Sequence, residues 1–209
     1  MTKKSHYIEE IFTRFSLGDA NPKPELVAPN AYCFLVCVVL SAQATDKSVN
    51  LATKPLFEKV KTPEEMLSLG RGALISYIKS IGLYNSKADH IIALSQKLIE
   101  EFDSKVPDDA EKLMALPGVG RKTANVVLNV VFGKATVPVD THVFRVSHRL
   151  SLSEGKSPEL VEKDLLKIVP EKFLKNAHHW LLLHGRYTCT ARNPKCSECI
   201  LKDLCPQGK

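Results

Sequence analysis

Four cysteines near the C-terminus have the spacing of a metal-binding loop. They follow the pattern C-x6-C-x2-C-x5-C, at Cys189, Cys196, Cys199 and Cys205. Four thiolates in one short loop can close around a single metal centre, and sulfur ligation suits either zinc or an iron–sulfur cluster. Spacing alone does not choose between them. Two other cysteines, Cys33 and Cys37, lie four residues apart in an apolar stretch and are predicted to be small buried hydrophobes.

The segment between the first two of these cysteines carries two cations, Arg192 and Lys195. A loop anchored by a metal centre would hold both side chains at fixed positions, which suits contacts with phosphate. The alternative is that they only keep the surface soluble.

A glycine-rich turn lies between two expected helices in the sequence LPGVGRK, from Leu116 to Lys122. Gly118 and Gly120 allow backbone dihedrals that a side chain would forbid. Such a turn exposes successive N–H groups beside the positive end of the next helix, which together form a phosphate-binding site. The alternative is an ordinary tight connection between helices.

The charge around this turn favours a nucleic-acid partner more than the whole-chain balance does. The chain has 29 Lys and Arg against 23 Asp and Glu, a net charge of +6. From Pro117 to Leu150 the local net charge is +4, because the segment contains five cations and a single acid, Asp140. These cations are Arg121, Lys122, Lys134, Arg145 and Arg149.

Lys122 falls in the first turn of the helix after the glycines. The helix dipole and Arg121 both disfavour a further positive charge there, which favours a neutral amine. A neutral lysine can attack carbon, and lysine is the usual residue for Schiff-base chemistry at a sugar C1′. From the residues alone, phosphate binding is the simpler role.

Asp140 ends an apolar extended segment, Val137 to Val139, and precedes another expected helix. Its simplest role is to cap that helix. A lone carboxylate in a basic region can also stabilise positive charge on a sugar, or take a proton from an attacking amine. Both roles can hold at once.

Helices must position these residues, because apolar side chains recur at helical spacing and no segment alternates as a strand does. The sequence therefore predicts an all-α fold. Thr62-Pro63 and Ser157-Pro158 are helix starts, and Pro55 should kink or shorten its helix. Helices are expected near residues 5–17, 30–43, 46–58, 63–69, 71–79, 86–102, 109–115, 120–132, 141–151, 158–168 and 176–188.

Composition places the protein among ordinary globular chains, with 44% hydrophobic content over 209 residues. The N-terminal segment has no apolar run of signal-peptide length. The longest apolar stretch, residues 31–42, is shorter than the roughly 20 residues that cross a bilayer and is predicted to be a buried helix. We expect a cytoplasmic monomer without a membrane partner.

Several segments closely resemble the endonuclease III family of the helix-hairpin-helix DNA glycosylase superfamily. They are LPGVGRKTANVVLN, VDTHVFR, LSAQATD, IGLYNSKA, HGRYTC and the terminal cysteine pattern, and together they span nearly the whole chain. The resemblance implies a [4Fe–4S] cluster rather than zinc on the four cysteines. It also implies that Lys122 is the nucleophile and Asp140 the catalytic carboxylate.

The resemblance assigns DNA contacts as well. Gln43 matches a residue that enters the space left by an extruded base, and Leu83 matches a wedge that inserts into the base stack. On sequence alone, Gln43 is a polar helix end and Leu83 a loop hydrophobe. The expected DNA contacts are Gln43, Leu83, Gly118, Gly120, Arg121, His142, Arg192 and Lys195.

The implied architecture has two helical domains flanking a DNA-binding cleft. Residues 24–133 form a six-helix domain with the helix-hairpin-helix, and residues 1–23 plus 134–209 form the domain of the iron–sulfur cluster loop. The implied partner is double-stranded DNA containing damaged bases or abasic sites, at the nucleoid. The implied activity is base excision repair, in which an oxidised pyrimidine is removed and the abasic site is cleaved by β-elimination.

Two other functions fit the residues less well. Monofunctional glycosylases of the same superfamily, such as those that remove adenine from mispairs, lack the lysine found at 122 and usually carry a further C-terminal domain. A non-catalytic DNA-binding or redox-sensing protein would need neither Lys122 nor Asp140. Both residues are present here.

Overall fold

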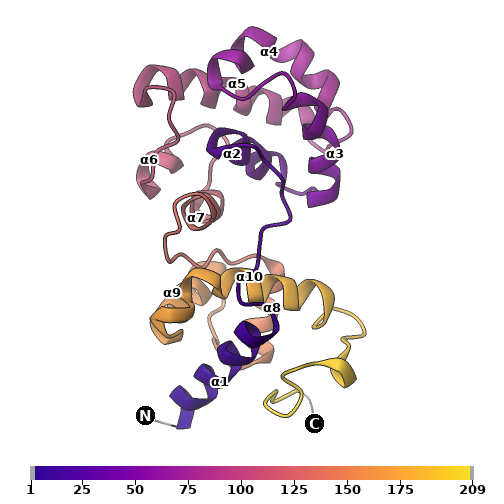
Figure 1. Cartoon of the computed structure of the whole chain (residues 1–209), viewed down its shortest axis with the longest axis vertical. Coiled ribbons are helices and arrows are strands. Elements are labelled where there is room, and N and C mark those ends of the chain that lie inside the picture. Colours follow the sequence, from indigo (N-terminus) through magenta and orange to yellow (C-terminus); the bar gives the residue numbers. More distant parts are fainter. Residues whose placement is uncertain (1–2, 208–209) are drawn as a thin grey trace. The chain divides into compact units, whose positions relative to one another are not determined.

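The computed structural model describes residues 3–207, which form helices and loops without a strand, so the predicted all-α fold is confirmed (Figure 1). The chain divides into two compact units, each described here by itself. We call Pro24–Gly133 the hairpin unit, and Met1–Lys23 with Lys134–Lys209 the cysteine unit. Each unit has its own cluster of buried apolar residues.

The hairpin unit is built around one buried helix, α2 (Ala31–Leu40), in which every residue from Tyr32 onward is buried. The Asn30 side chain caps α2 by accepting a hydrogen bond from the Cys33 N–H at 2.8 Å. Burial raises the pKa of the Cys33 and Cys37 thiols to about 12 each, as suits inert core residues. Within residues 3–207, no helix is long and apolar enough to cross a membrane.

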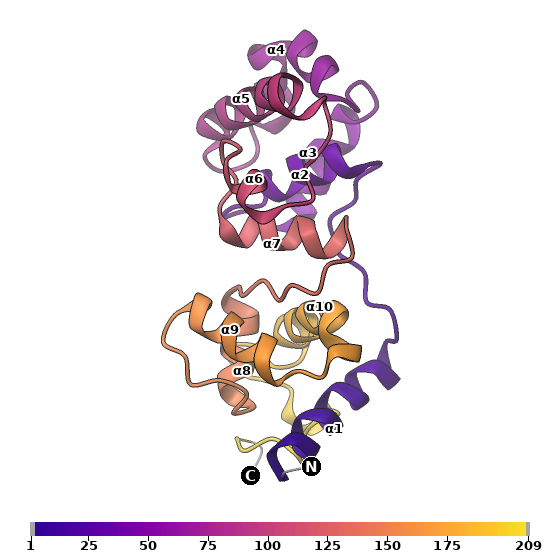
Figure 2. The same ribbon diagram turned by 90° about the vertical axis from the view of Figure 1, so that its left-hand side faces the viewer.

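Five further helices surround α2 in the hairpin unit, and α3, α5 and α7 pack directly on it (Figure 2). Helix α4 is broken at Gly70, whose φ is 76°, where the sequence predicts two helices. Helix α3 ends one residue after Pro55, so it is shortened as expected. The five are α3 (Asp46–Leu56), α4 (Pro63–Ile78), α5 (Tyr84–Phe102), α6 (Ala110–Met114) and α7 (Arg121–Val130).

The cysteine unit combines the two ends of the chain. Its longest helix, α10 (Glu171–Tyr187), packs against α1 (Lys3–Gly18) and α8 (Thr141–Arg149). It also contains α9 (Pro158–Ile168), which packs on α8, and the short 3₁₀ helix η1 (Cys196–Glu198).

The start of α10 differs from the sequence prediction by one turn and a half, because contacts with α1 extend it. Phe173 stacks on Phe12 with ring centroids 6.0 Å apart, and Lys172 pairs with Glu9 at 2.6 Å. These partners are distant in the sequence, so local patterns do not show them. The 3₁₀ helix η1 was not predicted either.

Candidate functional site

The turn between α6 and α7 requires glycine at its first position for two reasons. Gly118 has a left-handed φ of 77°, and a Cβ added there would lie 2.8 Å from the Cβ of His90 on α5. A side chain would therefore suffer both backbone strain and a clash. The buried residue Val119 closes the turn by donating its N–H to the Leu116 carbonyl at 3.1 Å.

The second glycine leaves the N-terminus of α7 bare. Gly120 is the N-cap, so no side chain accepts from the first-turn N–H groups, and no acid lies in that turn. Arg121 and Lys122 begin the helix and are both exposed. The Lys122 side chain makes no hydrogen bond or ion pair with any other described residue. This end of α7 is therefore suited to an anion, with an unengaged amine beside it.

Asp140 divides its two carboxylate oxygens between separate tasks. Oδ1 accepts both capping hydrogen bonds of α8, from the N–H groups of His142 at 2.9 Å and Val143 at 2.8 Å. Oδ2 has no partner among the described residues. The predicted N-cap geometry is thus present, and one oxygen is left for another contact. Buried Val137 and Val139 anchor the preceding segment in the core of the cysteine unit.

Gln43 and Leu83 share an uncommon backbone conformation. Their φ angles are 55° and 60°, in the left-handed region, where a non-glycine residue costs roughly 1–2 kcal/mol. Gln43 is exposed in the loop after α2, and Leu83, with 60% of its surface exposed, occupies the N-cap position of α5. Each side chain is presented outward from a strained turn, a feature that concentrates at functional sites.

The four C-terminal cysteines are all free thiols, and all lie in the cysteine unit. Burial raises the pKa of the Cys199 thiol, and the thiols of the other three cysteines raise it further. The Cys199 sulfur is thus close enough to the other three for their charge to oppose its ionisation, which a bound cationic centre would relieve. The Leu201 N–H donates to the Cys199 sulfur at 3.4 Å, a contact that suits a ligating thiolate.

The arrangement of these four sulfurs bears on which kind of centre they can hold. Among the described residues, no group of three or more His, Cys, Asp or Glu side chains is arranged to hold a single metal ion. A single zinc ion would need four sulfurs at about 2.3 Å from one point. A [4Fe–4S] cluster has one iron for each cysteine, so its ligands need not converge in this way. The donor set fits such a cluster.

Two arginines of α8 hold the first cysteine in place. Arg145 donates from Nε to the Cys189 carbonyl at 3.1 Å and from Nη2 to the Gly185 carbonyl at 2.7 Å. Arg149 donates from Nη1 to the Cys189 sulfur at 3.3 Å and to the Thr190 carbonyl at 2.7 Å. In the sequence both arginines contribute only to the general basic charge, whereas the structure engages them inside the cysteine unit.

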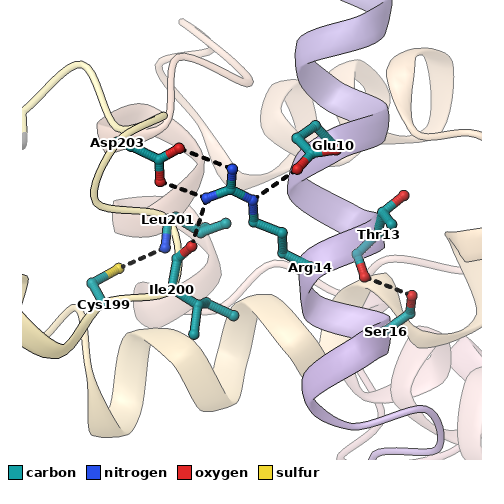
Figure 3. Close-up of polar contacts among 8 residues, drawn as sticks. All are labelled: Glu10, Thr13, Arg14, Ser16, Cys199, Ile200, Leu201 and Asp203. Atoms are coloured by element: carbon teal, nitrogen blue, oxygen red, sulfur yellow. Dashed lines mark hydrogen bonds and ion pairs between the residues drawn. The ribbon is translucent and has the colours of Figure 1, made fainter.

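Helix α1 holds the other end of the loop. Arg14 binds Asp203 through both Nη atoms and donates to the Ile200 carbonyl at 2.9 Å (Figure 3). Glu10, one turn earlier, accepts from Arg14 Nε at 2.8 Å. The N-terminal helix therefore contributes to the loop although nearly 190 residues separate Arg14 from Asp203. No local sequence signal indicated this contact.

The remaining predicted contacts also lie in the cysteine unit. Arg192 and Lys195 are exposed on the loop, which Thr190 orders by donating from Oγ1 to the Arg192 carbonyl at 2.7 Å. His142 is half-buried, and its Nδ1 lies 3.3 Å from Arg145 Nη2. Lys122, Gln43, Leu83 and the two glycines belong to the hairpin unit, whereas Asp140 belongs to the cysteine unit.

Comparison with known families identifies two matching regions. Residues 36–171 match the HhH-GPD superfamily base excision DNA repair proteins, a range that includes both Lys122 and Asp140. Residues 189–205 match the iron–sulfur binding domain of endonuclease III, a range that begins and ends at a cysteine of the loop.

Individual relatives agree with these matches over nearly their full length. The chain is 57% identical to endonuclease III of Rickettsia felis over 202 residues, covering 97% of this chain and 95% of that protein. It is 53% identical to endonuclease III of Escherichia coli over 196 residues, covering 94% and 93%. The structure of a trapped endonuclease III–DNA covalent intermediate matches with a TM-score of 0.91 and 44% identity, covering 100% of this chain and 98% of that one.

Proposed function

Because this chain belongs to the HhH-GPD superfamily of base excision DNA repair proteins, and within it to the endonuclease III family, we propose that it removes oxidised pyrimidines from duplex DNA. It is a bifunctional enzyme, a DNA glycosylase that also cleaves the strand at the resulting abasic site. The observation that carries the assignment is an exposed, unengaged Lys122 at the start of α7, inside a family match that also contains Asp140.

DNA binding is assigned to the anion-binding turn and to the exposed cations. A backbone phosphate sits at the uncapped N-terminus of α7, with Gly118, Gly120 and Arg121 around it. Leu83 enters the base stack and Gln43 fills the space of the extruded nucleotide. Arg192 and Lys195 contact phosphate from the loop, and His142 contacts DNA beside Asp140. The protein acts as a monomer on DNA of the cytoplasmic nucleoid.

Lys122 supplies the nucleophile. Its neutral amine attacks C1′ of the extruded nucleotide, the C1′–N bond breaks, and the base leaves with the bonding electrons and a proton. The C1′–O4′ bond of the sugar then breaks as the amine passes its remaining proton to O4′, and a covalent imine joins Lys122 to the opened sugar. Loss of a proton from C2′ then drives β-elimination of the 3′ phosphate. Water finally releases the enzyme, leaving a nicked strand with an unsaturated sugar fragment.

Asp140 assists through the oxygen that the helix cap does not use. Oδ2 stabilises the positive charge that develops on the sugar as the base departs, and it supports the proton transfers. Oδ1 stays engaged with α8, so the carboxylate is held in one orientation throughout.

The enzyme carries a [4Fe–4S] cluster, and we assign its four ligands to Cys189, Cys196, Cys199 and Cys205. The cluster contributes structural cross-linking when it is bound. Arg145, Arg149 and Arg14 hold the surrounding loop, which keeps Arg192 and Lys195 in fixed positions.

A direct assay tests this function. The protein is incubated with a duplex that carries thymine glycol at one position, and the products are separated on a denaturing gel with and without hot alkali. Strand scission without alkali is the expected result. Scission that appears only after alkali would indicate a monofunctional glycosylase, and no cleavage in either lane would contradict the assignment.

A further inference from the structure

A buried histidine of α10 forms a hydrogen bond with the segment that precedes Asp140. His178, only 3% exposed, has its Nδ1 at 2.7 Å from the carbonyl oxygen of Pro138. A carbonyl oxygen only accepts, so Nδ1 carries the proton in this contact. Pro138 is buried in a region without strands, so its carbonyl has no sheet partner among the described residues. His178 supplies the donor that such a buried group needs.

The same helix makes a second contact on the other side of Asp140. A Cβ added to Gly185 would lie 2.9 Å from the Cβ of His142 and 3.1 Å from its carbonyl oxygen. Glycine is therefore what allows α10 to approach the first turn of α8 so closely. His178 and Gly185 are seven residues apart, about two helical turns, and so lie on one face of α10. That face touches the chain two residues before Asp140 and two residues after it.

We infer that His178 is a positioning residue for Asp140. By fixing the Pro138 carbonyl, it sets the peptide plane through which the chain enters Val139 and Asp140. The carboxylate can then cap α8 through Oδ1 and keep Oδ2 aimed away from the helix. The inference rests on the proposed function, in which Oδ2 acts on the sugar. A small displacement of a catalytic group has a large kinetic cost, up to roughly 100-fold for 1 Å.

A purely structural role for His178 makes a different prediction. If the hydrogen bond only satisfies a buried carbonyl, its loss should lower stability and slow every step alike. If it positions Asp140, its loss should slow base release more than cleavage of a pre-formed abasic site, for which the aldehyde already exists. The ratio of these two rates is therefore the informative quantity.

Three variants distinguish a positioning role of His178 from a purely structural one. His178→Leu removes the donor and keeps an apolar side chain, whereas His178→Asn keeps an amide N–H close to the position of Nδ1. His179→Leu is the matched control. His179 is also buried, at 7% exposed, and packs edge-on against the His178 ring at 5.0 Å, but it has no hydrogen bond to the Asp140 segment among the described residues.

The experiment measures single-turnover base release from a thymine glycol duplex and cleavage of an abasic-site duplex, at a temperature where every variant is folded. His178→Leu should slow base release about 10-fold and abasic cleavage less than about twofold. His178→Asn should restore base release to within about threefold of the native rate. His179→Leu should keep the native ratio of the two rates. If His178→Leu does not fold, base release should still be faster in His178→Asn than in His178→Gln, because the glutamine amide lies one methylene too far from the backbone.

A double-variant cycle shows whether the effect passes through the carboxylate. In an Asp140→Asn background, His178→Leu should slow base release by no more than about a further twofold. An undiminished 10-fold loss there, an equal slowing of both steps, the absence of rescue by asparagine, or the same split in His179→Leu would each overturn the inference. Native base release by Asp140→Asn alone would instead contradict the proposed function, which keeps the two failures distinguishable.

Discussion

Arg149 donates from one Nη atom to both the sulfur and the carbonyl oxygen of Cys189, at 3.3 and 3.4 Å. Arg149 is also the last residue of α8, the helix that Asp140 caps at its other end. The nine-residue helix α8 is thus capped by the proposed catalytic carboxylate at one end and holds a proposed cluster ligand at the other. This contact fixes the cysteine loop to the core of the unit together with those of Arg145 and Arg14.

Replacing Arg149 should therefore weaken retention of the cluster. Arg149→Leu removes donors from the Cys189 sulfur and from loop carbonyls, each worth roughly 1–3 kcal/mol when a half-buried partner is left unsatisfied. Iron and sulfide per protein should fall together, and the visible absorbance should decay faster in a chelator. Arg192 is an exposed loop arginine whose side chain makes no such contact. Arg192→Leu is therefore the control and should retain its cluster. Equal decay in both variants would show that charge, not the contact, matters.

The two glycines of the turn should respond differently to alanine. Gly118→Ala places a side chain at φ 77° and against His90, so it should lower the free energy of unfolding by roughly 1–3 kcal/mol and weaken DNA binding. Gly120→Ala meets no atom within 4 Å and has an ordinary φ of −89°, so its stability loss should stay below about 1 kcal/mol. Denaturant titration measures both values. Equal losses would mean that the left-handed turn is not what Gly118 provides.

Leu83→Ala should separate DNA processing from stability. Leu83 is 60% exposed, so its truncation should change stability by less than about 0.5 kcal/mol. The wedge offsets an unstacking cost of roughly a few kcal/mol, so processing of a base-paired lesion should suffer more than cleavage of a pre-formed abasic site. Parallel kinetics on the two duplexes test this difference. If both rates fall by the same factor, Leu83 is not a wedge.

Asp140→Asn should preserve the fold while slowing base release. Asparagine is as good an N-cap as aspartate, so α8 should keep its cap, whereas Asp140→Ala should cost about 1 kcal/mol. Loss of the negative charge should slow departure of the base but leave the lysine able to react with an abasic aldehyde. Thermal melts and single-turnover rates report the two effects. A marked loss of stability in Asp140→Asn would show that its charge serves folding.

Features that depend on neighbouring residues were predictable from the sequence. The Thr62 and Ser157 caps, the Asp140 cap and the glycine turn each involve side chains and backbone groups within a few positions of one another. The burial of α2 follows from its unbroken apolar composition. Such signals need no knowledge of which helices meet.

Features that depend on distant partners were not predictable. In the sequence, Arg145 and Arg149 cannot be distinguished from arginines that bind DNA. Only the fold reveals that they contact the cysteine loop. His178 looks like any histidine on a helix until Pro138 is placed beside it. The early start of α10 and the Arg14–Asp203 contact depend on α1 in the same way.

Borohydride trapping shows whether Lys122 forms a covalent imine with the sugar. Borohydride added during turnover reduces an imine to a stable amine, so the protein should become linked to thymine glycol DNA, with the link at Lys122 in peptide maps. Lys122→Gln keeps comparable length and polarity without the nucleophile. It should bind DNA nearly as well as the native protein, yet lose both trapping and strand scission. A Lys122→Gln protein that traps and cleaves at the native rate would contradict the nucleophilic role of Lys122 and place the reacting amine elsewhere.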